Sequence, residues 1–186
     1  MKPPTHWRRS IRTEGAMETA TDPLDKLHAC HGRIEEQLQT LETMARRLSA
    51  GIPDRAAESA AKAVMRYFDT TGAQHHRDED EDLFPLLRAR AAALGRIEVA
   101  AGIDELEREH ATLDAQWRRL REALGAVAAL REDACIDAGD AERFAWLYRR
   151  HMDREAQLVL PFARETLGPG ERTELGARMA ARRGAK

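Results

Sequence analysis

Two stretches of the sequence share one pattern: they read HHRDEDEDLFP at residues 75–85 and HMDREAQLVLP at residues 151–161. In each, the first histidine is followed by a glutamate four residues later and by a proline after six more. A separate histidine precedes each stretch, since His31 lies 44 residues before the first and His110 lies 41 residues before the second. The chain therefore contains an internal repeat, which is a stronger indication of architecture than any single spacing.

The repeat also distinguishes two overlapping pairs within the first stretch. His75 with Glu79 and His76 with Asp80 are both four residues apart, so either pair would share one face of a helix. Only His75 and Glu79 coincide with a histidine and a glutamate of the second stretch when the two prolines are aligned. We therefore take His75 and Glu79 as the repeated pair.

Apolar residues recur at alternating steps of three and four, which is the spacing of one face of an α-helix. Only 5% of the residues are aromatic, and Ala, Leu, Glu and Arg dominate, which favours helices over strands. The pattern predicts four helices, namely one from Pro23 to just before Gly51, one from about residue 54 to 94 that Pro85 breaks or kinks, one ending near Val127, and one over about 140–167. Four such helices most simply form an antiparallel, up-down four-helix bundle, so the predicted fold class is all-α.

The bundle is expected to occupy residues 22–168. Residues 1–21 show no apolar periodicity and are predicted to be a disordered leader to which we assign no function. Residues 169–186 are expected to form a tail that adds at most a short, exposed helix.

Charge and hydropathy exclude several classes of protein. The 30 Lys and Arg residues are interleaved with 32 Asp and Glu residues, which argues against a nucleic-acid partner, because such proteins gather their basic residues into a patch. No run of about 18 apolar residues suggests a membrane span, and no apolar signal core follows the basic N-terminus. Two cysteines are too few for a disulfide framework. We expect a cytoplasmic protein without membrane association.

Six polar residues occupy positions on the helical faces where the apolar pattern calls for Leu or Ile. They are His31, His75, Glu79, His110, His151 and Glu155. A buried carboxylate is costly unless a cation compensates it, and no Lys or Arg lies beside these glutamates on the same faces. A metal ion satisfies carboxylates and imidazoles together, and iron, manganese and zinc all accept such ligands. Two metals could share the site if each received two histidines and one oxygen from each glutamate.

These six residues, with the proline after each His-Glu pair, resemble the hemerythrin-like (HHE cation-binding) family over about residues 23–167. The resemblance implies an up-down four-helix bundle around a non-haem di-iron centre, bridged by the two carboxylates and by an oxide or hydroxide. The ligand set is specific for the fold and the metal and much less specific for the activity.

The family's roles suggest a protein that binds or senses oxygen, nitric oxide or another small redox ligand. The alternative is a di-iron enzyme of oxidative or nitrosative stress defence, including iron-sulfur cluster repair. The oxygen carriers of the family have a fifth histidine four residues after the one on the third helix, where this sequence has Asp114. The repair branch has a cysteine in an N-terminal extension, and this leader has none. We expect a binding or sensing protein, acting as a monomer or homodimer.

Three further residues could belong to the site. His28 lies one helical turn before His31, His76 follows His75, and Asp114 lies one turn after His110. Each could be an additional ligand or could hydrogen-bond to a ligand, because metal-bound imidazoles generally donate their second N–H to an acceptor. The alternatives are a solvated imidazole for His76 and a surface carboxylate for Asp114.

Overall fold

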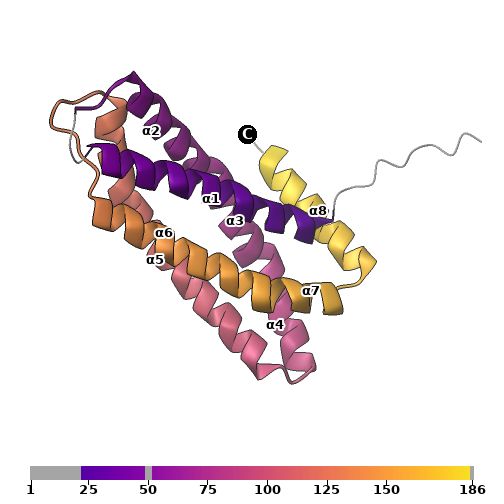
Figure 1. Ribbon diagram of the computed structural model, residues 1–186. Helices are drawn as coiled ribbons and strands as arrows, with labels where there is room; N and C mark the ends of the chain where they lie inside the picture. Colours follow the sequence, from indigo (N-terminus) through magenta and orange to yellow (C-terminus); the bar gives the residue numbers. More distant parts are fainter. Residues whose placement is uncertain (1–21, 49–51, 185–186) are drawn as a thin grey trace, which may run out of the picture.

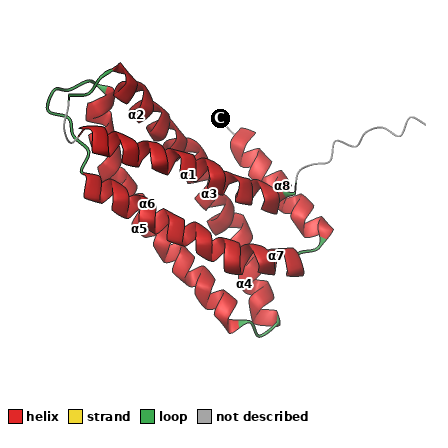
Figure 2. Cartoon of the chain, viewed as in Figure 1, coloured by secondary structure: helices red, strands yellow, loops and turns green. Residues whose placement is uncertain are grey.

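The computed structural model describes residues 22–48 and 52–184, and these residues form helices joined by short loops, without strands (Figures 1 and 2). Three of the helical elements are single π-helical turns, labelled η. The elements in chain order are α1 (Pro23–Leu48), α2 (Arg55–Tyr67), η1 (Phe68–Gly72), α3 (Ala73–Asp78), η2 (Glu79–Leu83), α4 (Phe84–Ala93), α5 (Ile97–Ala128), α6 (Ala138–Arg154), η3 (Glu155–Val159), α7 (Leu160–Thr166) and α8 (Pro169–Gly184). The expectation of an all-α protein is confirmed. The leader predicted for residues 1–21 lies outside the described residues.

Local capping interactions explain where the helices begin and end. The side chain of Asp54 accepts a hydrogen bond from the backbone N–H of Ala57 at 2.8 Å at the start of α2, and that of Asp137 accepts one from Asp140 at 2.8 Å at the start of α6. Each satisfies an N–H that has no partner within its helix. After α4 the chain turns at Gly95, whose φ of 67° lies in the left-handed region that glycine adopts without strain.

Pro85 and Pro161 do not end their helices, so the chain is not broken at Pro85, which was one of the two outcomes expected there. The backbone N–H of the residue before each proline, Phe84 or Leu160, donates to the carbonyl five residues back, at Glu79 or Glu155. Each π turn widens the helix just before a residue that cannot donate a backbone hydrogen bond, so helical structure continues beyond the proline.

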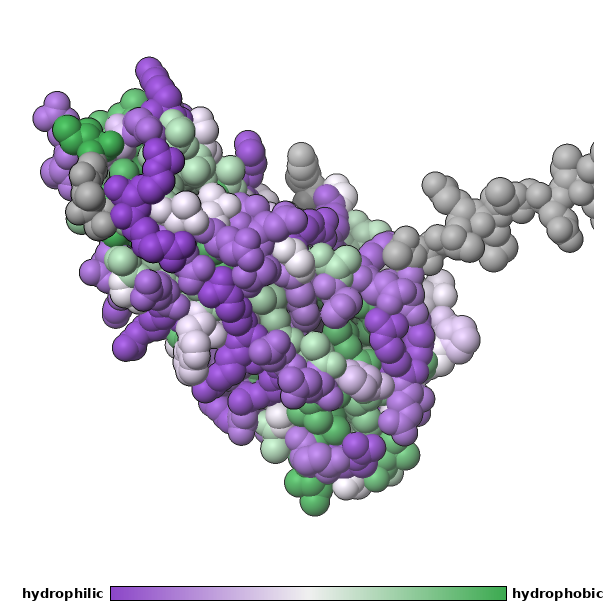
Figure 3. Space-filling model, in the orientation of Figure 1, coloured by the Kyte–Doolittle hydropathy of each residue, from purple (hydrophilic) through white to green (hydrophobic). Residues whose placement is uncertain are grey.

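Four long helical segments pack against one another lengthwise, as Figure 1 shows. They are α1, the run from α2 to α4, α5, and the run from α6 to α7. Direct contacts join α1 to α2, α2 to α5, α5 to α6 and α6 to α1. Polar side chains cover most of the face seen in Figure 3, and none of the described helices combines the length and hydrophobicity needed to cross a membrane.

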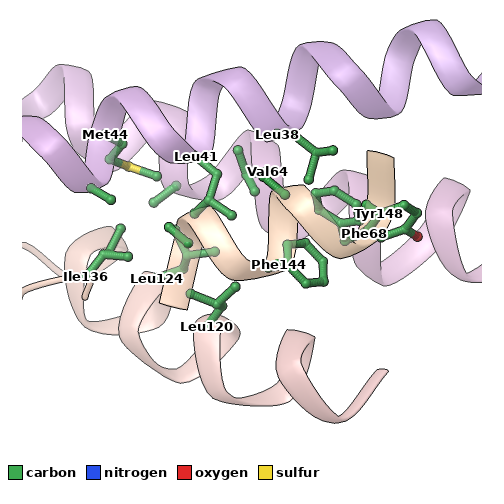
Figure 4. Packing of buried hydrophobic residues seen from close by; sticks show 14 of the residues in the cluster. Leu38, Leu41, Met44, Val64, Phe68, Leu120, Leu124, Ile136, Phe144 and Tyr148 are labelled. Atoms are coloured by element: carbon green, nitrogen blue, oxygen red, sulfur yellow. The ribbon is translucent and has the colours of Figure 1, made fainter. Parts of the chain in front are cut away.

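The buried apolar residues form two clusters rather than one continuous core. The larger cluster includes Leu38, Leu41, Val64, Leu124 and Phe144 (Figure 4). The smaller cluster lies toward the other end of each segment; it includes Leu27, Phe84, Ile103, Leu106 and Phe162. His75, Glu79, His110 and Glu155 fall between the members of one cluster and those of the other, whereas His31 and His151 lie at the edge of the larger cluster, beside Cys30 and Met152.

The C-terminal helix α8 is longer and better packed than the exposed helix expected for the tail. Leu175 and Met179 are buried in the smaller apolar cluster. Arg182 forms ion pairs with Asp78 and Asp82 of the second segment. These contacts fasten α8 across α1 and the run that contains Glu79.

Candidate metal centre

The six predicted site residues come together in one buried layer between the two apolar clusters. Glu79, Glu155 and the histidines at 75, 110 and 151 are each at most 3% exposed, and His31 is 9% exposed. Each of the four helical segments contributes at least one of these side chains. Both His-Glu pairs keep their partners one turn apart on one face, because the π turn begins only at the glutamate.

Glu79 lies between histidines of two different segments. Its Oε1 is 3.5 Å from Nε2 of His75, and its Oε2 is 3.5 Å from Nε2 of His110. The two carboxylate oxygens therefore face opposite sides of the layer.

Glu155 is arranged in the complementary way. Its Oε2 is 2.8 Å from Nε2 of His31 and 4.0 Å from Nε2 of His75. Its Oε1 is 2.6 Å from Nε2 of His151 and 4.0 Å from Nε2 of His110. Two sets of four donors result, one containing His31 and His75 and the other containing His110 and His151. Both sets include the two glutamates, and within each set the donor atoms lie within 4.8 Å of one another.

The donor atoms fit a bound cation because most of them lack a hydrogen-bond partner. The buried side-chain atoms without one are His31 Nε2, both ring nitrogens of His75, Glu79 Oε2 and both carboxylate oxygens of Glu155. The short approach of His31 to Glu155 does not have hydrogen-bond geometry. Buried polar atoms are nearly always paired, and a metal ion is the partner that suits imidazole nitrogens and carboxylate oxygens together.

The buried carboxylates and imidazoles of the layer shift one another's pKa values. Burial and the charge of Glu155 raise the pKa of Glu79 to about 7. Burial acts to raise the pKa of Glu155 too, but the positive charge of His151, whose Nε2 lies 2.6 Å from Oε1, holds this pKa well below its usual range. For His110, burial opposes the charged form, yet the hydrogen bond to Asp80 and the nearby carboxylate of Glu79 raise its pKa to about 10. The positive charge of the histidines therefore offsets part of the repulsion between the two buried carboxylates.

Two acidic residues that the sequence analysis did not assign to the site hold the outer nitrogens of two histidines. Asp80 Oδ1 is 2.8 Å from His110 Nδ1, and Glu109 Oε2 is 3.2 Å from His151 Nδ1. Such acceptors leave Nε2 free to face a metal and fix the orientation of the ring. In the sequence, Asp80 is seen only as part of the alternative pair with His76. Glu109 adjoins His110 in the sequence, but its carboxylate lies against His151. Both contacts join different helices, so spacing along one helix could not predict them.

The three additional candidates have different surroundings. His28 is exposed, and its ring centroid lies 5.8 Å from that of His31. His76 is buried and stacks on His110 with ring centroids 4.0 Å apart. The carboxylate of Asp114 is 63% exposed and lies 3.9 Å from His76 Nδ1, not against the ring of His110. The sequence offers Asp114 as an acceptor for the second N–H of His110. In the structure, Asp80 and not Asp114 lies against that nitrogen.

The fold and the site define a class: an all-helical protein with a buried layer of histidines and glutamates suited to binding metal ions. The family model of the hemerythrin HHE cation-binding domain matches residues 22–163, and the chain belongs to that family. It is also 31% identical to an uncharacterized protein of Haemophilus influenzae, over 90% of this chain and 94% of the relative. The matched region contains all six predicted site residues.

Proposed function

We propose that the buried layer holds two iron ions bridged by Glu79 and Glu155. One ion would be bound by His31 and His75, and the other by His110 and His151. The observation that supports this assignment is the way each glutamate directs one oxygen toward each pair of histidines. Manganese and zinc accept the same donors.

The function proposed for this centre is the binding or sensing of a small redox ligand such as oxygen or nitric oxide. A bound pair of iron ions would supply redox chemistry and coordination positions that the four protein donors leave open. The protein's own residues do the rest: Asp80 and Glu109 orient two of the imidazoles, and the two apolar clusters shield the layer from water on both sides. We further propose that the four segments meet at this layer in the antiparallel, up-down order expected for the family.

Metal analysis of protein produced with iron supplied tests the assignment. We expect close to two iron ions per chain and near-ultraviolet charge-transfer absorption after oxidation in air. His31→Ala should lower the iron content sharply, whereas His28→Ala, one turn away on the same helix and exposed, should leave it unchanged. A fully folded wild-type protein that stays free of metal under these conditions would overturn the proposal.

Turnover assays separate binding from the enzymatic alternative. If the iron-loaded protein binds nitric oxide or oxygen without consuming it over repeated additions, the binding or sensing function is supported. Catalytic consumption of nitric oxide or peroxide in the presence of a reductant would favour the di-iron enzyme instead.

A further inference from the structure

A cleft of about 450 Å³ opens beside the candidate metal centre, between the start of the η1–α3 region, α5 and α6. Aromatic side chains form much of its wall, among them Phe68, Trp117 and Phe144. Their rings pack against one another, with the Phe68 centroid 4.8 Å from that of Trp117 and 5.4 Å from that of Phe144. Phe68 and Phe144 lie next to Tyr148 in Figure 4.

The inner wall of this cleft touches the candidate ligands. His76 lines the cleft, stacks on His110 with an interplanar angle of 18°, and has its ring centroid 5.7 Å from that of His151. Tyr148 lines it too and places its hydroxyl 2.9 Å from His76 Nε2. One layer of side chains, formed by His76 and Tyr148, therefore separates the cleft from the histidines of the second donor set.

A ring nitrogen of His76 lies within 4.8 Å of ring nitrogens of His110 and His151, but the orientation of the ring favours a partition over a further ligand of that set. Its Nε2 is engaged by Tyr148, and its Nδ1 faces Asp114. An imidazole binds a metal through an in-plane lone pair, so two rings on one ion have planes that both pass close to that ion. The rings of His76 and His110 are instead nearly parallel and stacked 4.0 Å apart. In this arrangement their planes run side by side and do not meet at a shared ion.

The backbone beside the cleft has an irregularity of its own. The π turn η1 runs from Phe68 to Gly72, both of which line the cleft. The other two π turns begin at Glu79 and Glu155. Single π turns inside α-helices often lie at functional sites, and here all three lie at the centre or at the cleft that adjoins it.

Volume alone would not select this cleft. Two others, of about 590 and 670 Å³, are lined by residues of α1 and α2 and by residues of α1 and α8 with its preceding loop. Neither includes His76, Tyr148 or any of the six site residues in its lining. What distinguishes the smaller cleft is its contact with the histidine layer.

We propose that the cleft is the entry route by which a small uncharged ligand reaches the His110–His151 side of the centre, with the hydrogen-bonded pair of His76 and Tyr148 as its inner gate. The aromatic wall favours weakly polar molecules over hydrated ions. Two carboxylates, Asp69 and Asp114, line the cleft against one cation, Arg121, which is paired with Asp69. This charge balance disfavours anions. The inference rests on the proposed function, since it needs metal ions in the layer.

Stopped-flow mixing of nitric oxide with the iron-loaded, reduced protein tests the route. Ala73 is exposed and lines the cleft, so Ala73→Trp should slow association and release alike by about tenfold, equivalent to a barrier about 1.4 kcal/mol higher, with unchanged affinity. Trp117→Ala widens the cleft, and His76→Ala removes one side chain of the gate. Both variants should therefore bind nitric oxide faster than the wild type. Iron content should stay at the wild-type level in all three variants.

Ala56→Trp is the matched control, because Ala56 is an exposed helical alanine that lines the larger cleft between α1 and α2. Its association rate should equal that of the wild type. If all three cleft variants retain iron and bind nitric oxide at the wild-type rate, the proposed route is wrong. If His76→Ala loses iron, His76 is a metal ligand and the proposed gate is wrong. A wild-type protein without iron, or without a spectral response to nitric oxide, would instead refute the proposed function.

Discussion

The two helical runs that carry the His-Glu pairs are repeats in sequence but not in surroundings. Aligned on their prolines, Asp78, Asp80 and Asp82 of the first run correspond to Arg154, Ala156 and Leu158 of the second. Within these two stretches, only the first His, the Glu, the Pro and the π turn are common to both. The repeat therefore preserves the donors and changes everything that supports them.

The residues that flank each His-Glu pair suit the helix against which that run packs. Asp78 and Asp82 are buried against α8, where Arg182 pairs with both. Leu158 packs against α5 so closely that a Cβ on Gly102 would lie 2.2 Å from its Cδ2. The acids of the first run pair with arginines of α8, whereas the second run packs Leu158 against α5 and pairs Arg154 with Glu105 and Glu109 of that helix. One motif can thus be held in place by unrelated interactions.

The donor sets differ in the same way. His110 and His151 have carboxylates on their outer nitrogens, supplied by Asp80 and Glu109. His75 has no hydrogen-bond partner on either nitrogen. If two metals bind, the His110–His151 side should hold the better oriented imidazoles. The predictions below address this difference, beginning with the change that should affect both sides.

Glu79→Gln should have the largest effect, because Glu79 faces both donor sets. An amide supplies one oxygen and no charge, so we expect loss of most of the iron from both sides and not from one alone. Iron analysis with parallel thermal unfolding measures this, and the melting temperature should lose its dependence on metal. Retention of one tightly bound iron would show that the two sides are independent.

Arg182→Gln tests the charged cover of the first run. Asp78 is fully buried, and leaving a buried charge with a weakened partner costs about 3–5 kcal/mol. We expect a loss of stability near the lower end of that range, since Arg183 also pairs with Asp78. Chemical denaturation of the metal-free protein measures the loss. The control is Arg164→Gln, which breaks an exposed ion pair with Asp25 and should cost at most about 1 kcal/mol.

Asp80→Asn tests the carboxylate support of the second donor set. Removal of such a partner from a metal-bound histidine typically weakens metal binding by about 10–100-fold. We expect the weaker binding on one of the two sites, measured by competition with a chelator. Asp114→Asn, a change of the same kind at an exposed carboxylate, should change the affinity less than about twofold. Equal losses in the two variants would contradict a specific role for Asp80.

The last prediction concerns how the stability of the metal-free protein depends on pH through Glu79. Burial and Glu155 raise the pKa of Glu79 to about 7 from 4.5, so the folded protein keeps a proton there that the unfolded chain releases. The stability that this proton contributes is present below pH 4.5 and is lost as the pH rises to 7. Both proteins are compared without metal. Relative to Glu79→Gln, the free energy of unfolding of the wild type should fall by up to about 1.4 kcal/mol per pH unit within this window and should fall no further above it. Denaturation of both proteins at pH 5, 7 and 8 checks this, and a constant difference would contradict it.

Much of the fold and the donor set could be predicted from local pattern. The steps of three and four placed four helical segments, and the histidines and glutamates stood out because they interrupted an apolar stripe. Pro85 does not break its helix, because the missing N–H of a proline can be accommodated by a π turn as well as by a helix end. The sequence also failed to predict that α8 packs against the bundle. Its two buried residues, Leu175 and Met179, form too short an apolar stripe to indicate a core contact.

The sequence by itself determined that this chain is helical and that six polar residues meet in its core, because helical periodicity fixes which side chains share a face. Only the tertiary structure decided which acids support which histidines and where a cleft approaches the layer. Asp80 reaches His110, Glu109 reaches His151, and Arg182 reaches Asp78. Each of these contacts joins helices far apart in sequence, and periodicity along one helix says nothing about the rotation and height at which a second helix packs against it.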